Sequence, residues 1–598
     1  MAFTNPRNKL AFAALVLATS MLIASNARHL ALNIDQVWIF QWITHFLGIG
    51  TIIIFMFGGR IGHWATKTIE RLDAWLSQSN GRATFWLGSL ILSYTLLWCG
   101  LTFLRHYYFH SQAFDLAIQD QVVWNTSRGY FLARSFEVTN DLGDHVRPYL
   151  ALLSLLYLAV PSPYVLLAFQ SFVLALSAWP LYVLARRKFD SPAIGLTIAF
   201  CALTYPPLGF LNRLDFHAEV IVVPLLMAAY ERVDAHDLRN AGIFMGLALL
   251  GKENIGLSVA ALALVIAVYH HHWRFGFLWC IGGLAYSLVA LFLIIPAFRG
   301  APSDTLARYQ WLGSTPIEML WTLLSSPLFV LQNLGVAERV LTLLQLLAPL
   351  AFLPLLSIPI LFAAAPTLIY NFLSAQPFQS GIYNQYMAPV IPFMAVAAVL
   401  GLHNLRRYTL KGQGFAGIRL EAPVSSHAVG LGVSLLLFAI LGSWIYENPV
   451  KGHPYLSELN KRRIAQTDRS TTRSTTKSSR ASFIQPNDAA IREGLKQVPK
   501  DVYLLTGQNY APHLSHRRQI QIIRPAPVSA LAPDVEAIFL NMKDLRRRSC
   551  DDYLQNLQAA TSAGFGVTFH RDGVILVEKG KGHRDKLDEL LAQWPGCH

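Results

Sequence analysis

The sequence predicts an α-helical polytopic membrane protein that carries a small α/β domain near its C-terminal end. The 598-residue chain is 53% hydrophobic but only 14% charged, whereas soluble domains average about 25% charged residues. Apolar stretches such as AFAALVLATSMLIA and LWCIGGLAYSLVALFLIIPAF recur along it, and a helix needs roughly 17–25 such residues to cross a bilayer. Beyond residue 483 the pattern changes to short β-rich runs separated by turn residues.

We expect about thirteen membrane spans. They lie near residues 9–26, 37–57, 85–105, 163–185, 192–211, 217–232, 240–250, 255–271, 275–297, 338–355, 357–374, 386–405 and 427–446. The segments 217–232 and 240–250 are short for a crossing, so we expect them to be tilted, broken or re-entrant. The segments 149–160 and 316–334 are typical of helices that lie at the membrane interface.

Basic residues predict the orientation of these spans, because loops on the cytoplasmic side carry excess Lys and Arg. With a cytoplasmic N-terminus, most basic loops fall on one side, including Arg186 to Lys188 after the fourth span and Arg406 with Arg407 after the twelfth. The same rule accounts for the net charge of +14, so we expect no nucleic-acid partner. We expect a multi-pass protein of the plasma (inner) membrane with an extracytoplasmic C-terminal domain, although one span more or fewer would move that domain to the cytoplasm.

Four regions follow from these patterns. Residues 1–84 form an extension with two transmembrane helices, residues 85–450 the main transmembrane domain, residues 451–482 a flexible basic linker rich in Ser and Thr, and residues 483–598 the α/β domain. In the last region IREGLKQV is amphipathic, while DVYLLTG, QIQIIRP, VEAIFLN and GVILVEK are predicted strands.

The loop after the third span holds the first group of candidate site residues. Asp115 and Gln121 lie among apolar neighbours in FDLAIQDQVVWNTSRGYF, and NDLGDHVRPYL adds His145 near the end of the loop. A carboxylate held at an apolar interface has the chemistry of a general base, a metal ligand or an ion-pair partner. The alternative interpretation of Asp115 is a helix cap or a salt bridge with Arg147 or Arg105.

The motif NRLDFHAEV forms the second group, with Asp215, His217 and Glu219 at alternate positions. Such spacing suits an extended segment or loop, and these oxygen and nitrogen ligands have the chemistry to hold a divalent cation or to transfer protons. A loop that merely keeps polar residues at the lipid headgroups is the alternative interpretation.

The third group is LLGKENIG, with Lys252 and Glu253 between two apolar stretches. Charge near the membrane interior indicates function, and Lys252 could neutralise a phosphate. These neighbours should not pair with each other, because adjacent positions do not face each other on a helix. Arg299 and Arg308 are candidates for an anionic group, and Tyr386 could stack on a sugar, although headgroup anchoring explains all three as well.

In combination, the motifs FDL-x4-Q-x2-W, RLDFHAE, GKEN, WRFG, IIPAFRG and QYMAPVIPF resemble a family of bacterial and archaeal membrane proteins of unknown function that is grouped with the GT-C glycosyltransferases. The resemblance covers roughly residues 100–405. It implies a GT-C-like fold in which Asp115 matches the essential acid of the first loop, as general base or metal ligand. Asp215, His217 and Glu219 match a second acidic loop, and Lys252 with Glu253 match a lysine-containing turn.

The resemblance also implies an activity, which is transfer of a sugar from a polyprenyl-phosphate carrier to an extracytoplasmic glycan, lipid or protein acceptor. By this interpretation Asp115, Asp215 and Glu219 are catalytic, and Gln121, His145, His217, Lys252, Glu253, Arg299, Arg308 and Tyr386 bind substrate. Asp115, Asp215, His217 and Glu219 are also candidates to bind Mg²⁺ or Mn²⁺, although the first loop lacks the adjacent acidic pair of many GT-C enzymes. The alternatives are a transporter and a non-catalytic assembly or sensor protein of the cell envelope.

Overall fold

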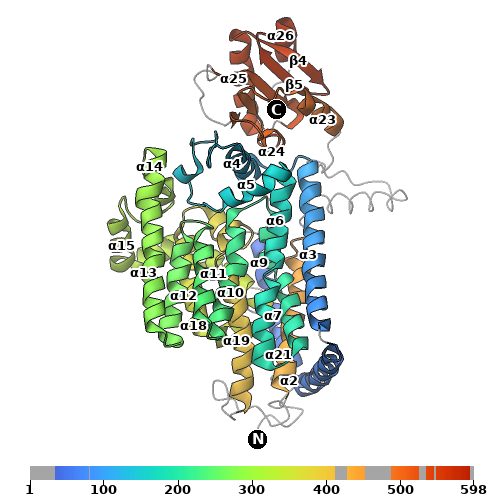
Figure 1. Ribbon diagram of the computed structural model, residues 1–598, viewed down its shortest axis with the longest axis vertical. Coiled ribbons are helices and arrows are strands. Elements are labelled where there is room, and N and C mark those ends of the chain that lie inside the picture. The colour runs from blue at the N-terminus through green and yellow to red at the C-terminus, as the bar shows by residue number, and fades with distance from the viewer. Residues whose placement is uncertain are drawn as a thin grey trace, which may run out of the picture.

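The computed structural model describes residues 34–79, 81–410, 427–450, 487–523, 534–544 and 547–592. In Figure 1 a bundle of helices forms the body of the molecule, and a domain with a β-sheet lies at one end of it. The predicted first span near 9–26 and the predicted linker at 451–482 lie outside the described residues.

Helices of the bundle begin where the sequence supplies helix-starting signals. Pro163, Pro192 and Pro206 each stand in a first helical turn, where a missing N–H is harmless. The helices are α2 (Ile34–Ser77), α3 (Arg82–Tyr107), α4 (Ile118–Ser127), α5 (Leu150–Ala159), α6 (Pro163–Ala175), α7 (Ala178–Phe189), α8 (Pro192–Leu203), α9 (Pro206–Arg213), α10 (Val222–Asp234), α11 (Leu238–Leu249), α12 (Ile255–Tyr269), α13 (Trp273–Val289), α14 (Ile295–Arg299), α15 (Pro316–Ser325), α16 (Pro327–Asn333), α17 (Val336–Leu347), α18 (Ile358–Leu373), α19 (Ile391–Leu410) and α21 (Ala428–Tyr446).

Short helical turns connect several of these helices. They are η2 (Ala113–Ala117), η3 (Asp141–Gly143), η4 (Ala218–Ile221), η5 (Ala290–Ile294), η6 (Asp304–Tyr309), η7 (Ala348–Leu350), η8 (Leu353–Leu356), η9 (Pro377–Gln379) and η10 (Gln385–Met387).

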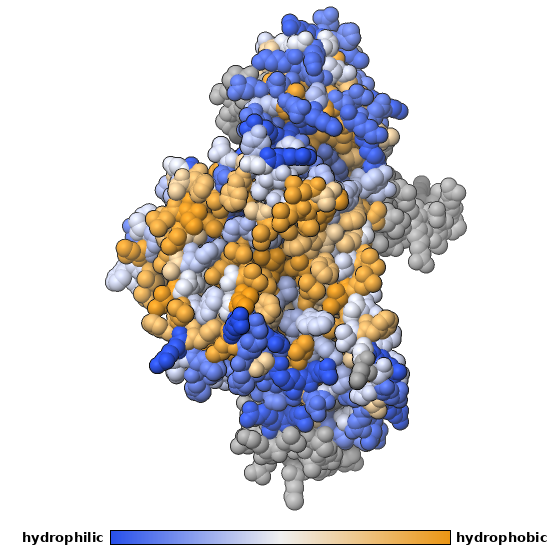
Figure 2. Space-filling model, in the orientation of Figure 1, coloured by the Kyte–Doolittle hydropathy of each residue, from blue (hydrophilic) through white to orange (hydrophobic). Residues whose placement is uncertain are grey.

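The bundle has the surface of a membrane protein. Figure 2 shows hydrophobic residues in a broad band over the helices, between two hydrophilic ends. Among the described residues, three helical segments are long and apolar enough to cross a membrane, Arg82–Tyr107, Pro163–Phe189 and Trp273–Arg299. Two bent pairs, α8 with α9 and α16 with α17, would raise the number to five. The expected total of about thirteen spans stays a prediction.

The predicted span near 37–57 is part of a longer helix. The residues after the predicted span 37–57 do not form a loop, because α2 continues as one helix of 44 residues to Ser77. Lys67 and Glu70 form an ion pair three residues apart on its exposed surface, a spacing that stabilises a helix. Polar composition alone therefore gave no reliable end for this helix.

The ends of three helices meet at one end of the bundle. The ends of α7, α10 and α19 meet, since Arg187 Nη2 lies 2.9 Å from Asp234 Oδ2 and the rings of Phe189 and His403 are 5.8 Å apart. The loop that contains η2 and α4 lies at the opposite end (Figure 1). The structure thus places the basic end of α7 and the candidate loop at opposite ends of the bundle, while the assignment of either end to a membrane face stays a prediction.

The C-terminal domain contains one five-stranded sheet with the order β2-β1-β3-β5-β4. β1 pairs in parallel with β2 and β3, whereas β5 is antiparallel to β3 and β4. The elements are α23 (Asp488–Gln497), β1 (Leu504–Thr506), α24 (Ala511–Leu514), β2 (Ile520–Ile522), β3 (Ala537–Asn541), η12 (Met542–Asp544), α25 (Arg547–Ser562), β4 (Phe565–Arg571), β5 (Val574–Lys579) and α26 (Arg584–Ala592). The four predicted strands and the amphipathic helix are confirmed, and β4 is additional.

The C-terminal domain packs directly on the loop between α3 and α5. Phe109, Ala113 and Phe136 of that loop share a buried hydrophobic cluster with Ile491 and Ile520 of the domain. The domain and this loop therefore lie on the same side of the bundle (Figure 1).

Candidate functional site

The structure brings the three predicted groups together at one end of the bundle. Asp115 comes from η2, Asp215 to Glu219 from the loop between α9 and α10, and Lys252 with Glu253 from the turn between α11 and α12. Ion pairs join the groups to one another rather than within themselves.

Asp115 and His217 form the first pair. Asp115 Oδ1 lies 3.2 Å from His217 Nε2, and 34% of the Asp115 side chain is exposed, so a substrate can reach it. The other ring nitrogen of His217, Nδ1, is 2.6 Å from the carbonyl oxygen of Asp215, to which it can donate. Nε2 then carries a proton toward Asp115 when the imidazole is charged.

This pairing shifts the pKa values of both groups. Burial opposes ionisation of Asp115, but the charge and hydrogen bond of His217 together with Arg105 lower the pKa of the carboxyl. Burial likewise opposes the charged form of His217, yet Asp115 and Glu219 raise the pKa of the imidazole. Asp115 is therefore an ionised, partly exposed carboxylate near neutral pH, as a general base requires.

Asp215 has a different environment. Its side chain is only 1% exposed. Asp215 Oδ2 accepts a 2.7 Å hydrogen bond from the backbone N–H of Gln112 and lies 3.6 Å from Arg105 Nη2. Gln112 directly precedes η2, so Asp215 fixes the start of the turn that carries Asp115. The structure thus gives Asp215 the position of a structural anchor for the first loop.

Lys252 and Glu253 pair outward, as predicted, and not with each other. Lys252 Nζ lies 2.6 Å from Glu219 Oε1. Glu253 Oε1 is 2.9 Å from His145 Nδ1, and its Oε2 accepts from the backbone N–H of Val146 at 3.0 Å. These contacts link the first loop, the second loop and the α11–α12 turn into one charged network.

A cavity of about 190 Å³ lies against this network. Its charged lining consists of Glu219, Lys252, Glu253, His145 and Arg308, and we call it the Lys252 cavity. Its polar lining includes Tyr309, Tyr370, Gln379, Gln385 and Tyr386, and its apolar lining includes Leu257, Leu291, Leu306 and Pro389. Arg308 donates to Gln379 Oε1 at 3.0 Å, and its guanidinium carbon is 5.7 Å from the ring centre of Tyr386.

Five predicted site residues do not line the cavity. Asp115, Asp215 and His217 belong to the adjoining network, whereas Gln121 and Arg299 have other partners. Gln121 is fully buried and donates to the carbonyl oxygen of Arg517 at 2.9 Å, so it holds the C-terminal domain. Arg299 pairs with Asp304 at the end of α14. The structure therefore brings together His145, Glu219, Lys252, Glu253, Arg308 and Tyr386.

The predicted metal ligands are arranged as partners of cations. Asp115 pairs with His217, Asp215 with Arg105, and Glu219 with Lys252. In the part of the chain that the structure describes, no group of three or more His, Cys, Asp or Glu side chains has the arrangement of a metal site. The donor set does not fit a divalent cation, and we derive no step through one.

Asp120 ties the C-terminal domain to the helix that follows Asp115. This fully buried carboxylate on α4 accepts hydrogen bonds from the hydroxyls of Tyr157 and Ser515, and it lies 3.0 Å from His516 Nε2. Buried carboxylates are stable only when they are paired and hydrogen-bonded. Because Asp115 and Asp120 occupy consecutive helical turns, the domain helps to hold Asp115 in place.

With this geometry established, comparison with known proteins adds the family. Residues 105–576 match a family described as Predicted membrane protein (DUF2079). The chain belongs to this family. The match spans the helical bundle from the first loop onward together with most of the C-terminal domain, and it confirms the predicted membership of an uncharacterised membrane protein family. No match to a curated protein was found.

Two solved structures of ArnT from Cupriavidus metallidurans are similar to this chain. The structure bound to undecaprenyl phosphate has 12% sequence identity and a TM-score of 0.39, covering 82% of this chain and 97% of ArnT. The apo structure has 12% identity and a TM-score of 0.40, covering 81% and 98%. Similarity at this level does not by itself establish a shared activity.

Sequence reasoning missed several residues that shape the site. Gln170 on α6 accepts from the backbone N–H of His217 at 2.9 Å and so supports the second loop. The Asp141 carboxylate accepts hydrogen bonds from Arg147 Nε at 2.9 Å and from Arg134 Nη1 at 3.0 Å, and these bonds stabilise the conformation of the first loop. A lone amide within an apolar span was a usable signal for Gln170, because buried polar groups in membranes need a partner. Nothing local distinguished Arg134 from other loop arginines.

Proposed function

We propose that this protein is a glycosyltransferase that transfers a sugar from a lipid phosphate carrier to an acceptor hydroxyl. The observation that carries the proposal is that the Asp115–His217 pair lies next to the Lys252 cavity. His217 belongs to the same short loop as Glu219, which lines that cavity. Cations that suit a phosphate and a carboxylate that suits a base thereby share one end of the bundle. The motif resemblance to GT-C enzymes supports the same activity.

Lys252 and Arg308 are the groups suited to the carrier phosphate. Both line the cavity, Lys252 from the α11–α12 turn and Arg308 from η6. Fixed cations in a cavity shielded from water stabilise the charge that develops on a leaving phosphate. Glu219 and Glu253 balance these two cations before substrate arrives, so the site is close to neutral without substrate.

Asp115 is suited to accept the proton of the acceptor. In the proposed step the acceptor oxygen attacks the anomeric carbon, the bond from that carbon to the phosphate oxygen breaks, and the hydroxyl proton passes to Asp115. The lipid phosphate leaves with the bonding electrons. His217 holds Asp115 ionised beforehand, and positioned acid–base catalysis of this kind contributes roughly 10²–10⁴-fold in rate.

The membrane-facing side of the cavity suits a polyprenyl tail. Leu291 of η5 lines the cavity, while Phe277, Leu278 and Leu293 on the same helical segment are exposed. This segment is among the three that can cross a membrane. A tail that lies along it remains in the hydrocarbon while the phosphate enters the cavity.

The test is the envelope chemistry of a deletion strain. Loss of the gene should remove one sugar modification from glycolipids or surface glycans, measured by mass spectrometry, and the wild-type chain should restore it. Asp115→Asn should not restore it although the protein reaches the membrane in equal amounts. The control, Asp585→Asn on exposed α26, should restore it fully.

Two results would contradict the proposal. Restoration by Asp115→Asn would remove the carboxylate from the chemistry. A deletion strain with an unaltered glycan and glycolipid profile, but with an altered uptake or envelope-assembly phenotype, would favour a transporter or a non-catalytic protein instead.

A further inference from the structure

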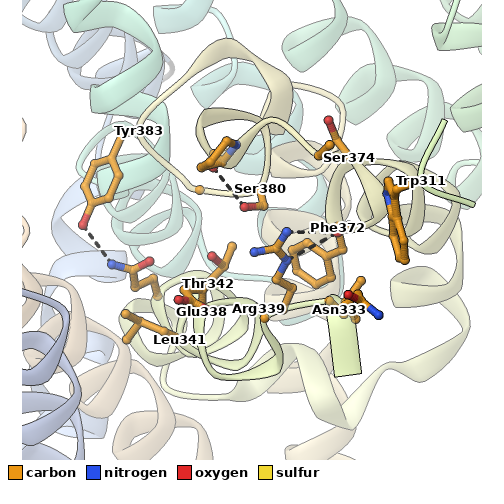
Figure 3. A pocket seen from close by; sticks show the side chains of 16 residues that line it. Trp311, Asn333, Glu338, Arg339, Leu341, Thr342, Phe372, Ser374, Ser380 and Tyr383 are labelled. Atoms are coloured by element: carbon orange, nitrogen blue, oxygen red, sulfur yellow. Dashed lines mark hydrogen bonds between the residues drawn. The ribbon is translucent and has the colours of Figure 1, made fainter. Parts of the chain in front are cut away.

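A second and larger cavity lies where the chain bends sharply between α16 and α17. It has a volume of about 740 Å³, within the roughly 300–1,000 Å³ that is usual for ligand sites. The two helices are bent by 75°, and Gly335 at the bend has φ +62°, a conformation that glycine adopts without strain. Residues 374–383 form the facing wall (Figure 3), and we call this space the elbow cavity.

Aromatic rings and uncharged polar groups alternate around the elbow cavity. Trp311 and Tyr383 stand on opposite sides in Figure 3, with Ser374, Ser380 and Thr342 between them. Hydroxyl and amide side chains both donate and accept hydrogen bonds, and amphipathic rings offer an apolar face with a polar edge. This combination suits a ligand that carries many hydroxyls on a compact frame.

The charge of the lining also selects the ligand. Its only charged side chains among the described residues are Glu338 and Arg339, one acid and one base, so the lining is neutral overall. The Lys252 cavity holds two cations, Arg308 and Lys252, beside two acids, Glu219 and Glu253. Two cations can contact a phosphate there, whereas the described lining of the elbow cavity offers only Arg339, so the elbow cavity is the better site for a neutral ligand.

Hydrogen bonds fix the orientation of the Arg339 side chain at the wall of the elbow cavity. Its Nε and Nη2 donate to the carbonyl oxygen of Phe372 at 3.3 and 3.2 Å, which fixes the guanidinium beside Ser380 (Figure 3). Those bonds engage two of its three nitrogens, so Nη1 remains to donate to a ligand hydroxyl. Donors fixed before binding lose little conformational entropy when the ligand arrives.

The two cavities share one wall. Ser374 and Ser380 line the elbow cavity, whereas Gln379 of the same segment lines the Lys252 cavity. Gln379 Oε1 accepts from Ser374 Oγ at 2.8 Å and from Arg308 Nη1 at 3.0 Å. Gln379 thus connects Ser374, which lines the elbow cavity, to Arg308, which lines the Lys252 cavity, by two hydrogen bonds.

We propose that the elbow cavity binds the acceptor of the transfer reaction, and that this acceptor is a neutral, hydroxyl-rich glycan. This inference rests on the proposed function. Units remote from the reacting hydroxyl occupy the elbow cavity, and the reacting end extends past Tyr386 to the Lys252 cavity. Binding of remote units lowers the barrier at the reacting centre, as enzymes use distant binding energy.

The test measures two binding reactions on the purified full-length protein in lipid nanodiscs. One probe is the fluorescently labelled pool of neutral oligosaccharides released from the envelope of the producing organism. The other is farnesyl phosphate, a short prenyl phosphate. Arg339→Ala and Trp311→Ala should each weaken glycan binding about tenfold, the effect of losing one charged hydrogen bond or one aromatic contact, and should leave farnesyl phosphate binding unchanged. Lys252→Met should have the opposite pattern.

Matched controls are Arg71→Ala and Trp64→Ala, which change exposed residues of α2 and should alter neither affinity. Equal glycan binding by wild type, Arg339→Ala and Trp311→Ala would overturn the inference, as would a wild type that binds farnesyl phosphate but no glycan. Loss of farnesyl phosphate binding in Arg339→Ala would assign the elbow cavity to the lipid carrier and overturn it as well. A wild type that binds neither probe would instead refute the proposed function.

Discussion

Acid should loosen the C-terminal domain from the first loop, and His513 provides the means to test this. The ring of His513 on α24 stacks on that of His106 at the end of α3, with centres 4.0 Å apart and an angle of 9° between the planes. Phe109 packs against the same ring at 4.8 Å. Burial, with Arg492 nearby, lowers the pKa of His513 to about 4, although Asp120 and a backbone contact with His106 oppose the shift.

The sign and size of the effect follow from this shift. Because the docked pKa lies below the ordinary value of about 6.5, the neutral ring stabilises docking fully above that pH, and the contribution is lost as the pH falls through 4. The difference between the ordinary pKa of about 6.5 and the docked pKa of about 4 corresponds to about 3 kcal/mol at its limit. Between pH 7 and pH 4.5, docking should weaken by about 2 kcal/mol, or roughly thirtyfold.

Hydrogen–deuterium exchange of the full-length protein in nanodiscs measures this opening. Peptides from residues 106–148 should exchange roughly thirtyfold faster at pH 4.5 than at pH 7, after correction for the intrinsic pH dependence of exchange. His513→Phe keeps a flat ring without a titrating group, so its acid response should be clearly smaller than that of wild type, and what remains should come from the other buried ring of the stack, His106. The control His583→Phe, at an exposed position, should respond like wild type. An undiminished acid response in His513→Phe would refute the reasoning.

Two further predictions concern the charged network. Glu219→Gln leaves the buried ammonium of Lys252 without its charged partner at 2.6 Å and should lower the free energy of unfolding by about 3–5 kcal/mol. Thermal melts in detergent measure this loss, and the double variant Glu219→Gln/Lys252→Met should recover most of it. Equal melting temperatures of wild type and Glu219→Gln would contradict the prediction. The ionised Asp115 stabilises the protein above its ordinary pKa of about 3.8, and this stabilisation is lost as the pH falls through the lowered pKa of the folded state. The charged His217 stabilises the protein below its ordinary pKa of about 6.5, and this stabilisation is lost as the pH rises through the raised pKa of the folded state. In His217→Gln, the charge of His217 is lost and Arg105 remains as the cation that opposes the effect of burial on Asp115, so the pKa of Asp115 and with it the acid limb of the transfer rate should move to higher pH. An unmoved limb would show that His217 does not control this carboxylate.

Much of the architecture was predictable because local pattern determines it. Apolar runs of a given length specify helices in a membrane protein, since every backbone polar group must be satisfied internally. For this reason the predicted spans 85–105, 255–271 and 357–374 correspond closely to α3, α12 and α18. The short strands β1, β3 and β5 follow equally from alternation and turn residues.

The candidate site was predictable as a set of residues but not as a set of partners. The sequence by itself determined that Asp115, Glu219 and Lys252 stand at the ends of apolar segments, because charge is excluded from the hydrocarbon. Only the tertiary structure decided that Asp115 pairs with His217 and Glu219 with Lys252, since these contacts join residues 102 and 33 positions apart.

The largest difference between sequence and tertiary structure lies at the C-terminal domain. Composition identified it as a folded α/β unit, but its attachment to the first loop through Asp120, Ser515 and His516 depends on side chains almost 400 residues apart. The local sequence pattern around Asp120 cannot predict this pairing, because the partners that stabilise a buried carboxylate come from distant parts of the chain. The sequence therefore determined which segments form apolar helices and which carry charge, and the tertiary structure alone decided which charges meet.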